Sequence, residues 1–262
     1  MDIGDPIDFS GRAVIVTGGT KGIGAAIARA FLSAGAEVLV CGRGDPPEPP
    51  RSGGRRAHFL RADVRDPEVA GALVAGAVER FGRLDVLVNN AGGSPDADAA
   101  TVSPRFVEKV VALNLLAPFY LAQAANRVMR EQRTGGSVIN IGSVSAHTPQ
   151  PGTAAYTAAK AGLLALTRAL ALEWAPSVRV NHITAGPVRT GSAASVYGAD
   201  EGAALGGVIP MRRMAAPDDV AQACLFLAGD LARYVNGADL AVHGGGEAPA
   251  RYLAVRGPLP DA

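Results

Sequence analysis

RAVIVTGGTKGIGAAIARAFLSA, residues 12–34, holds three kinds of sequence in direct succession. Residues 12–17 are rich in valine and isoleucine, which is typical of a strand buried on both faces. Glycines follow at positions 18, 22 and 24, and an apolar helical pattern begins at residue 22. The stretch therefore predicts a strand, a tight glycine turn and a helix.

The same alternation continues along the chain. Strands are predicted at 12–17, 37–41, 57–61, 85–89, 137–141, 178–183 and 239–242, and helices at about 22–34, 67–82, 104–132, 153–175 and 217–229. Strands that alternate with helices form parallel sheets through right-handed crossovers. We expect a single α/β domain over residues 1–262, with a doubly wound Rossmann-type fold whose mainly parallel seven-stranded sheet carries helices on both faces.

Three connecting segments have distinctive compositions. Residues 44–56 contain several prolines and a glycine pair, which predicts an irregular loop without a helix. Residues 189–214 are rich in glycine and alanine, as expected of a mobile substrate lid. The tail from about residue 247 has two interpretations, a segment that reaches over a neighbouring subunit and a frayed terminus.

Composition excludes several classes of partner. The chain is 48% hydrophobic and 19% charged, with a formal net charge of +1, so it lacks a basic field for nucleic acid or an anionic membrane. Cys41 and Cys224 form no metal-binding or disulfide pattern, and His147 and His182 are isolated in the sequence. The N-terminus does not resemble an export signal. We expect a soluble cytoplasmic protein that needs no metal and binds a small molecule.

The glycine turn predicts a phosphate site. Without Cβ atoms at Gly18, Gly22 and Gly24, the backbone can approach a pyrophosphate, and the following helix offers free N–H groups and a favourable dipole. The alternative is a tight connection with a purely structural role.

Tyr156 and Lys160 are four residues apart in a predicted helix, so their side chains share one face. A phenol with a pKa of about 10 needs a shift of about 3 units, or about 4 kcal/mol, to exchange protons near neutral pH. An ammonium about 4 Å away supplies energy of that order, although desolvation opposes it. Ser143 ends a predicted strand, where its hydroxyl can polarise a carbonyl oxygen. A serine nucleophile is not expected, because the Gly-x-Ser-x-Gly turn is absent.

Together, the TGxxxGxG pattern, NNAG at 89–92, Ser143 and the YxxxK pattern resemble the short-chain dehydrogenase/reductase family, over about residues 8–246. The resemblance implies a nicotinamide dinucleotide cofactor. Its implied contacts are Gly18, Thr20, Lys21, Gly22, Ile23 and Gly24 in the turn, Asp63 and Val64 at the adenine, Asn90, Ala91 and Gly92 under the adenosine ribose, Tyr156 and Lys160 at the nicotinamide ribose, and Pro187, Val188 and Thr190 at the carboxamide. Asn89 is expected to tie neighbouring strands together.

The resemblance also implies the roles of the catalytic residues. Tyr156 exchanges the proton, Ser143 orients the carbonyl, and Lys160 tunes Tyr156 and holds the ribose. Asn114 binds a water that relays the proton, although an asparagine that bends its helix is the alternative. The sequence departs from the family where Ala185 replaces the usual proline, which weakens the assignment of the carboxamide contacts.

The end of the second strand bears on the choice of cofactor. It reads Cys41, Gly42, Arg43, with no acidic residue for the ribose hydroxyls. Arg43 and Lys21 suit a 2′-phosphate, so NADP(H) is favoured over NAD(H). Both cations could instead be solvated, and Asp45 could reach a ribose if the proline-rich loop folds back.

These features predict an NAD(P)(H)-dependent oxidoreductase that interconverts a ketone and a secondary alcohol, with a 3-oxoacyl thioester as one candidate substrate. Related enoyl-thioester reductases space tyrosine and lysine seven apart, and Leu163 stands at that position here, so carbonyl chemistry is preferred. The alternative is a non-catalytic dinucleotide-binding regulator. By resemblance, helices 104–132 and 153–175 would pair subunits into a homotetramer.

Overall fold

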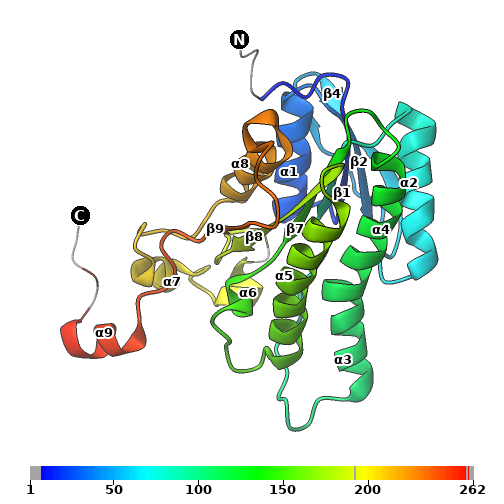
Figure 1. Cartoon of the computed structure of the whole chain (residues 1–262). Helices are drawn as coiled ribbons and strands as arrows, with labels where there is room; N and C mark the ends of the chain where they lie inside the picture. Colours follow the sequence, from blue (N-terminus) through cyan, green and yellow to red (C-terminus); the bar gives the residue numbers. More distant parts are fainter. Residues whose placement is uncertain (1–6, 192, 258, 260–262) are drawn as a thin grey trace.

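A seven-stranded sheet runs through the centre of the molecule, and every neighbouring pair of its strands is parallel (Figure 1). The structure is a computed structural model that describes residues 7–191, 193–257 and 259. In spatial order the strands are β5 (His58–Arg61), β2 (Glu37–Gly42), β1 (Ala13–Thr17), β6 (Val86–Asn89), β7 (Gly136–Ile141), β8 (Val178–Ala185) and β9 (Asp239–Val242). All the predicted strands are confirmed, with ends that differ by two residues or fewer.

The strand order reverses at β1, which pairs with β2 on one side and with β6 on the other. Loops that leave neighbouring strands in opposite directions open a crevice at the carboxyl edge of a sheet. The glycine turn follows β1 and the NNAG stretch ends β6, so both border this crevice.

Helices cover both faces of the sheet (Figure 1). The elements on one face are α1 (Gly22–Ser33) and α8 (Pro217–Ala228), and those on the other are α2 (Pro67–Phe81), α4 (Ala117–Met129) and α5 (Ala154–Trp174). Side chains of β1 alternate between the two cores, since Val14 and Val16 pack with the first group of helices and Ile15 with the second. The doubly wound architecture is confirmed.

The helix predicted at 104–132 is interrupted. It consists of α3 (Pro104–Val111), a π-helical turn η1 (Ala112–Leu116) and α4. The side chain of Asn114 donates to the carbonyl of Val110 at 2.9 Å, the acceptor that its own backbone N–H would use in an α-helix. This competition accounts for the local widening, which apolar periodicity does not reveal.

The expected irregular loop at 44–56 contains a small hairpin, so that prediction is only partly right. β3 (Arg51–Ser52) and β4 (Arg55–Arg56) pair antiparallel. Gly53 and Gly54, with φ of +56° and +73°, form the turn between them. Two-residue hairpin turns favour this left-handed backbone, which glycine adopts without strain.

The segments at the carboxyl edge are short. The expected lid contains α6 (Ala193–Tyr197) and α7 (Ala203–Val208), while Ser192 lies outside the described residues. The tail forms α9 (Ala250–Arg256), which buries none of its residues and projects from the rest of the chain (Figure 1).

The remaining elements are the 3₁₀ turns η2 (Val144–Ala146) and η3 (Asp230–Ala232). Among the described helices, none is long and apolar enough to cross a membrane.

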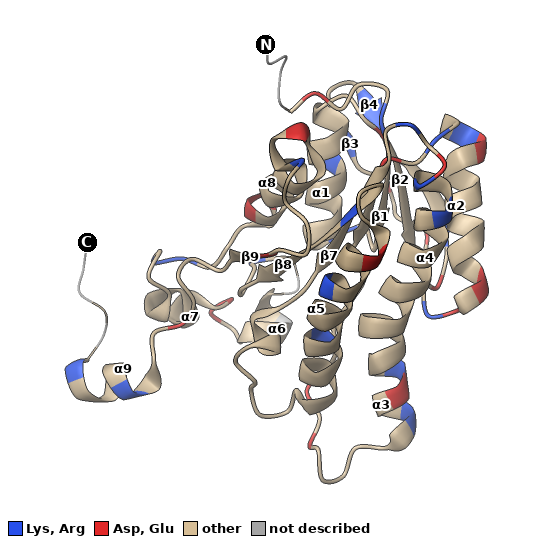
Figure 2. Ribbon diagram, viewed as in Figure 1, with Lys and Arg blue, Asp and Glu red and all other residues tan. Residues whose placement is uncertain are grey.

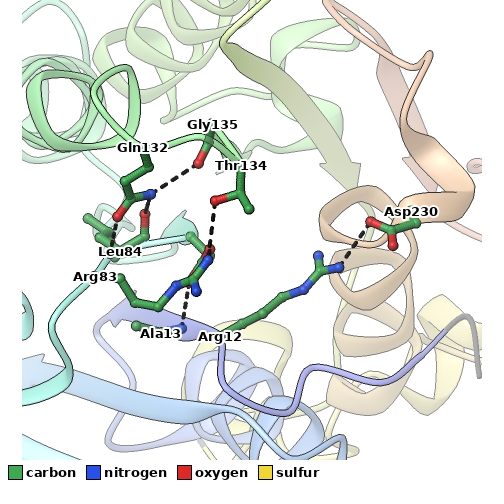
Figure 3. A network of polar contacts seen from close by, with 9 residues as sticks. Arg12, Ala13, Arg83, Leu84, Gln132, Thr134, Gly135 and Asp230 are labelled. Atoms are coloured by element: carbon green, nitrogen blue, oxygen red, sulfur yellow. Dashed lines mark hydrogen bonds and ion pairs between the residues drawn. The ribbon is translucent and has the colours of Figure 1, made fainter.

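A closed set of polar contacts ties the amino edge of the sheet together (Figure 3). The carboxylate of Asp85 accepts from the backbone N–H of Ala13 at 2.9 Å and from two nitrogens of Arg83 at 2.6 and 2.7 Å. The side-chain amide of Gln132 bonds to both backbone groups of Leu84. We call this set the amino-edge network, which comprises Ala13, Arg83, Leu84, Asp85, Gln132, Thr134 and Gly135.

Candidate active site

The glycine turn after β1 is packed too tightly for side chains. A Cβ at Gly24 would lie 2.3 Å from the carbonyl oxygen of Gly18, and one at Gly19 would lie 2.5 Å from Val40. Gly18 and Gly22 also have positive φ angles of +62° and +53°. At the N-terminus of α1, no side chain caps the helix at Lys21. The first N–H groups of α1 are therefore available to an anionic ligand.

Asn90 fixes this turn against β6. Its side chain donates to the carbonyl of Thr17 at 2.8 Å. The backbone N–H groups of Asn90 and Ala91 donate to the hydroxyl of Thr17 at 3.0 and 2.9 Å. Asn89 instead donates to Asn140 of β7 at 2.9 Å, which confirms that it ties neighbouring strands.

A cavity of about 620 Å³ lies above the turn. It brings together thirteen of the predicted cofactor residues: Gly18, Thr20, Lys21, Gly22, Ile23, Gly24, Arg43, Asp63, Val64, Asn90, Ala91, Gly92 and Thr190. Sequence reasoning missed Cys41, Gly42, Ala62, Arg65, Leu113 and Gly191, which also line it. Because a close-packed glycine cradle and an uncapped helix N-terminus meet in one cavity, the residues present fit a dinucleotide.

The cations of this cavity differ in their surroundings. Arg65 forms an ion pair with Asp63 through both carboxylate oxygens. The hydrogen bonds from Arg65 hold the pKa of Asp63 below its usual value, although burial opposes them. Within the described residues, neither Lys21 nor Arg43 forms an ion pair. These two side chains therefore remain available to a ligand phosphate.

Lys160 is buried at the carboxyl edge, on α5. Its ammonium donates to the carbonyl of Ile141 at 2.7 Å and lies 5.7 Å from the centre of the Tyr156 ring. Burial lowers the pKa of Lys160 to about 8. The predicted pair is thus close in space.

Tyr156 lies near Ser143, whose hydroxyl donates to the hydroxyl of Ser145 at 3.2 Å. Burial raises the pKa of Tyr156 above its ordinary value, while the nearby Ser143 works in the opposite direction. The groups of the protein alone therefore do not lower the pKa of Tyr156, because burial of the phenol and the nearby Tyr197 outweigh the effect of Ser143. The Ser143 hydroxyl also accepts from the backbone N–H of Ser145 at 3.1 Å.

Asn114 and Lys160 meet at Gly92. A Cβ on Gly92 would lie 2.9 Å from the side-chain oxygen of Asn114 and 3.2 Å from the ammonium of Lys160. The Asn114 amide donates to the carbonyls of Gly93 and Val110, and its oxygen accepts from the N–H of Gly93. Both amide hydrogens are thus used, so a relay water could bond to the second lone pair of its oxygen or to backbone groups freed by η1.

The carboxamide contacts predicted after β8 are divided between two places. Thr190 lines the dinucleotide cavity, whereas Pro187 lines a neighbouring cavity of about 310 Å³. Val188 is buried and forms a β-bridge with Ala215, so its side chain is part of the core.

Two histidines that are isolated in the sequence meet in the structure. His147 and His182 both contact the carboxylate of Asp239 on β9, at 2.9 and 2.7 Å. The expectation that they are isolated is therefore wrong in space, because β8 and β9 place His182 opposite Asp239. Within the described residues, no cluster of histidine, cysteine, aspartate or glutamate has the arrangement of a metal site.

Comparison with known proteins now identifies the family. A family profile described as enoyl-(acyl carrier protein) reductase matches residues 18–247. An uncharacterized oxidoreductase of Mycobacterium tuberculosis is 38% identical, and the match covers 98% of each chain. D-threitol dehydrogenase of Mycolicibacterium smegmatis is 36% identical over 91% of this chain and 95% of its own.

Structure comparison gives the same result. The aldohexose dehydrogenase of Thermoplasma acidophilum superposes with a TM-score of 0.83 at 29% identity, covering 96% of this chain and 97% of its own. The chain belongs to the short-chain dehydrogenase/reductase family. As a short-chain dehydrogenase/reductase, it is a dinucleotide-dependent oxidoreductase with a nicotinamide cofactor, in a family that typically uses no metal.

Proposed function

We propose that the protein interconverts a ketone and a secondary alcohol, with Tyr156 as the group that exchanges the proton. The observation that carries the proposal is the placement of the Tyr156 ring 5.7 Å from the Lys160 ammonium and near Ser143, next to Gly92, which lines the cavity that fits a dinucleotide. Acid, carbonyl donor and cation thus lie around one point at the carboxyl edge of the sheet.

In the reducing direction, Tyr156 donates its hydroxyl proton to the substrate oxygen while Ser143 donates a hydrogen bond to the same oxygen. When bound, the nicotinamide supplies the hydride for the carbonyl carbon in its reduced form and accepts it in its oxidised form. The ammonium of Lys160 stabilises the phenolate that remains on Tyr156, and we assign it a second contact with the ribose. Asn114 holds the water through which a solvent proton returns to Tyr156.

The carbonyl is favoured over a carbon–carbon double bond as the group that reacts. The family profile is named for an enoyl reductase, whereas the threitol and aldohexose relatives are named for alcohol oxidation. Here the lysine lies four residues after Tyr156, on the same face of α5, and the position seven residues after it holds the buried Leu163. The 3-oxoacyl thioester remains a candidate substrate.

The preference for NADP(H) over NAD(H) rests on charge. Lys21 and Arg43 line the dinucleotide cavity, and Gly42 at the end of β2 leaves that position without a carboxylate. A 2′-phosphate binds to cations through charge-assisted hydrogen bonds. No metal takes part in the proposed reaction.

We also propose a homotetramer built on α4 and α5. Figure 2 shows these helices largely without charged residues. Leu172 on α5 is 85% exposed in the single chain. Exposed apolar side chains on a helix face of low charge are typical of subunit contacts. Sedimentation equilibrium tests the proposal, and a monomer at micromolar concentration would disprove it.

The experiment that tests the function uses Tyr156→Phe, which removes one oxygen and keeps the ring. Ketones, secondary alcohols, sugar alcohols and enoyl thioesters are screened with NADPH and NADH, and the best substrate is used for both enzymes. We expect kcat to fall by about 10³-fold while NADPH binding, followed by nicotinamide fluorescence, changes little. Undiminished turnover would refute the mechanism, and tight binding without turnover on any substrate would favour a non-catalytic regulator.

A further inference from the structure

A second polar cluster lies beside the catalytic one. The carboxylate of Asp239 accepts from the Nδ1 atom of His182 and from the hydroxyl of Thr184, each at 2.7 Å, through one oxygen. Its other oxygen is 2.9 Å from the Nε2 atom of His147. An ionised carboxylate only accepts hydrogen bonds, so both imidazole nitrogens carry a proton toward it. Asp239 thus joins three side chains from two parts of the chain.

One of those parts is the catalytic turn, which we define as residues 141–147. It begins with the carbonyl of Ile141 that holds Lys160, contains Ser143 and ends with His147. The bond from His147 to Asp239 therefore fastens the end of the catalytic turn to β9. The beginning is fastened by the N–H of Gly142, which donates to the carbonyl of Ile183 in β8 at 2.8 Å.

His182 packs against the catalytic turn at Gly142, near its beginning. Its side chain is fully buried, and a Cβ on Gly142 would lie 2.0 Å from its Cε1 atom and 2.1 Å from Nε2. The ring thus touches the backbone directly before Ser143. Because Nδ1 bonds to Asp239, the plane of this ring is fixed by the carboxylate.

The charges around the cluster keep Asp239 in the form that accepts. Burial raises its pKa, but the hydrogen bonds from Thr184 and His182 outweigh that effect and leave the pKa below its ordinary value. Burial lowers the pKa of His182 below its ordinary value, although the hydrogen bond and the charge of Asp239 oppose this, and Lys160 and His147 act in the same direction as burial. A neutral His182 with its proton on Nδ1 satisfies the contact without placing a second cation near Lys160.

We propose that Asp239 is a positioning residue for Ser143, acting through His147 and His182 on the two sides of the catalytic turn. The proposal rests on the function proposed above, because it assigns a consequence to the place of the Ser143 hydroxyl. Asp239 lines the neighbouring cavity of about 310 Å³ together with Pro187 and does not line the dinucleotide cavity. Its loss leaves the cofactor cavity intact and displaces the group that polarises the substrate oxygen.

The test is a double-mutant cycle between Asp239→Ala and Ser143→Ala. In the otherwise native enzyme, we expect Asp239→Ala to lower kcat by about 10- to 100-fold, since a displacement of about 1 Å has effects of this size. KM and NADPH affinity should stay within about threefold. In the Ser143→Ala background, the same substitution should change kcat by less than about threefold, because the group it positions is already gone. Asp239→Asn, which keeps one acceptor for His182, should recover most of the lost activity.

Asp85→Asn is the matched control, a buried carboxylate of the amino-edge network far from the site. It should lower stability without changing kcat in either background. Equal losses of kcat from Asp239→Ala with and without Ser143 would overturn the proposal, as would an unchanged kcat. If Asp239→Ala does not fold, Asp239→Asn takes its place in the same cycle. It should then lower kcat about threefold or more when Ser143 is present, and by less than that in the Ser143→Ala background.

A readout that needs no turnover separates this proposal from the proposed function. The N–H of Ser145 donates to the Ser143 hydroxyl, so its hydrogen exchange reports the position of that hydroxyl. We expect Asp239→Ala to speed this exchange at least about tenfold, and Asp85→Asn to leave it unchanged. Faster exchange in a protein that turns over no substrate would support the positioning role of Asp239 and contradict the proposed function. Unchanged exchange would remove the positioning role alone.

Discussion

The polar groups at the two edges of the sheet differ in how completely they are hydrogen-bonded. At the amino edge, the guanidinium of Arg83 pairs with the carboxylate of Asp85, and the amide of Gln132 bonds to backbone groups (Figure 3). Within the described residues, the buried side-chain atoms without a partner are Asn89 Oδ1, His182 Nε2 and His243 Nδ1. They belong to the last residue of β6, the ring beside Gly142 and the residue after β9, all toward the carboxyl edge.

Because of this difference, the polar groups of the amino edge contribute to stability, whereas those of the carboxyl edge remain available to a ligand. A saturated network contributes to the free energy of folding and leaves nothing with which to bind a ligand. The carboxyl edge instead holds a buried ammonium, Lys160, whose lowered pKa is a cost to the folded state. The three predictions below test this comparison.

The largest effect is expected for Lys160→Met. Loss of the ammonium should lower kcat/KM by about 10³-fold or more, because the phenolate and the ribose both lose their cation. At pH 7 the same change should raise the free energy of unfolding by about 1–2 kcal/mol. The desolvation cost of about 3 kcal/mol disappears, and the lost bond to Ile141 offsets part of the gain.

The stability advantage of Lys160→Met should depend on pH, because the pKa of Lys160 differs between the folded and unfolded states. The pKa of Lys160 falls from 10.5 to about 8 on folding, so the unfolded chain binds this proton more tightly. The cost is complete below pH 8 and vanishes as the pH rises toward 10.5. Urea unfolding at pH 7 and pH 10 should therefore show the advantage of Lys160→Met shrinking. A constant difference between the two proteins would contradict the lowered pKa of Lys160 in the folded state.

A smaller effect is expected at the amino edge, where a substitution should lower stability and leave activity unchanged. Asp85→Asn removes the charge that Arg83 and the N–H of Ala13 share, and it should lower the free energy of unfolding by about 2–3 kcal/mol. Because the network lies at the edge opposite the catalytic residues, kcat per folded molecule should not change. Thermal unfolding and initial rates on the same sample check both parts. A loss of kcat would show that the two edges are coupled.

The smallest effect is expected at the open end of the dinucleotide cavity. Arg43→Ala should weaken NADPH binding about tenfold and NADH binding less than about twofold, since only the former carries a 2′-phosphate. Fluorescence titrations with both nucleotides measure the ratio. Arg61, which donates to the carbonyl of Arg43, offers the control Arg61→Ala, which keeps the Arg43 side chain. Equal losses for both nucleotides would remove the assigned phosphate contact.

Much of the architecture could be predicted from the sequence. Strands such as β1 carry unbroken runs of apolar residues, and Gly18, Gly22 and Gly24 mark the turn, so local pattern is sufficient there. Tyr156 and Lys160 were predictable for the same reason, because four residues of helix fix their separation.

Other features depend on contacts between distant segments. Asp239 and His182 are 57 residues apart, and only the register of β8 and β9 places them opposite one another. The π-helical turn at Asn114 arises from competition between a side chain and the backbone, which leaves the apolar periodicity unchanged. Arg65 lines the dinucleotide cavity and pairs with Asp63, a contact that local sequence pattern does not reveal.

The hairpin of β3 and β4 occupies the place where a crossover helix would cover the sheet. None of the four residues of β5 is fully buried, whereas all five of β1 are. At the tip, a Cβ on Gly54 would meet no atom within 4 Å. This corner of the molecule lies beside the C-terminal end of α1, where a Cβ on Gly53 would approach Leu32 and Ser33. It is thus a natural point for inserting a peptide tag or a fluorescent label, away from the glycine turn and outside the packed interior.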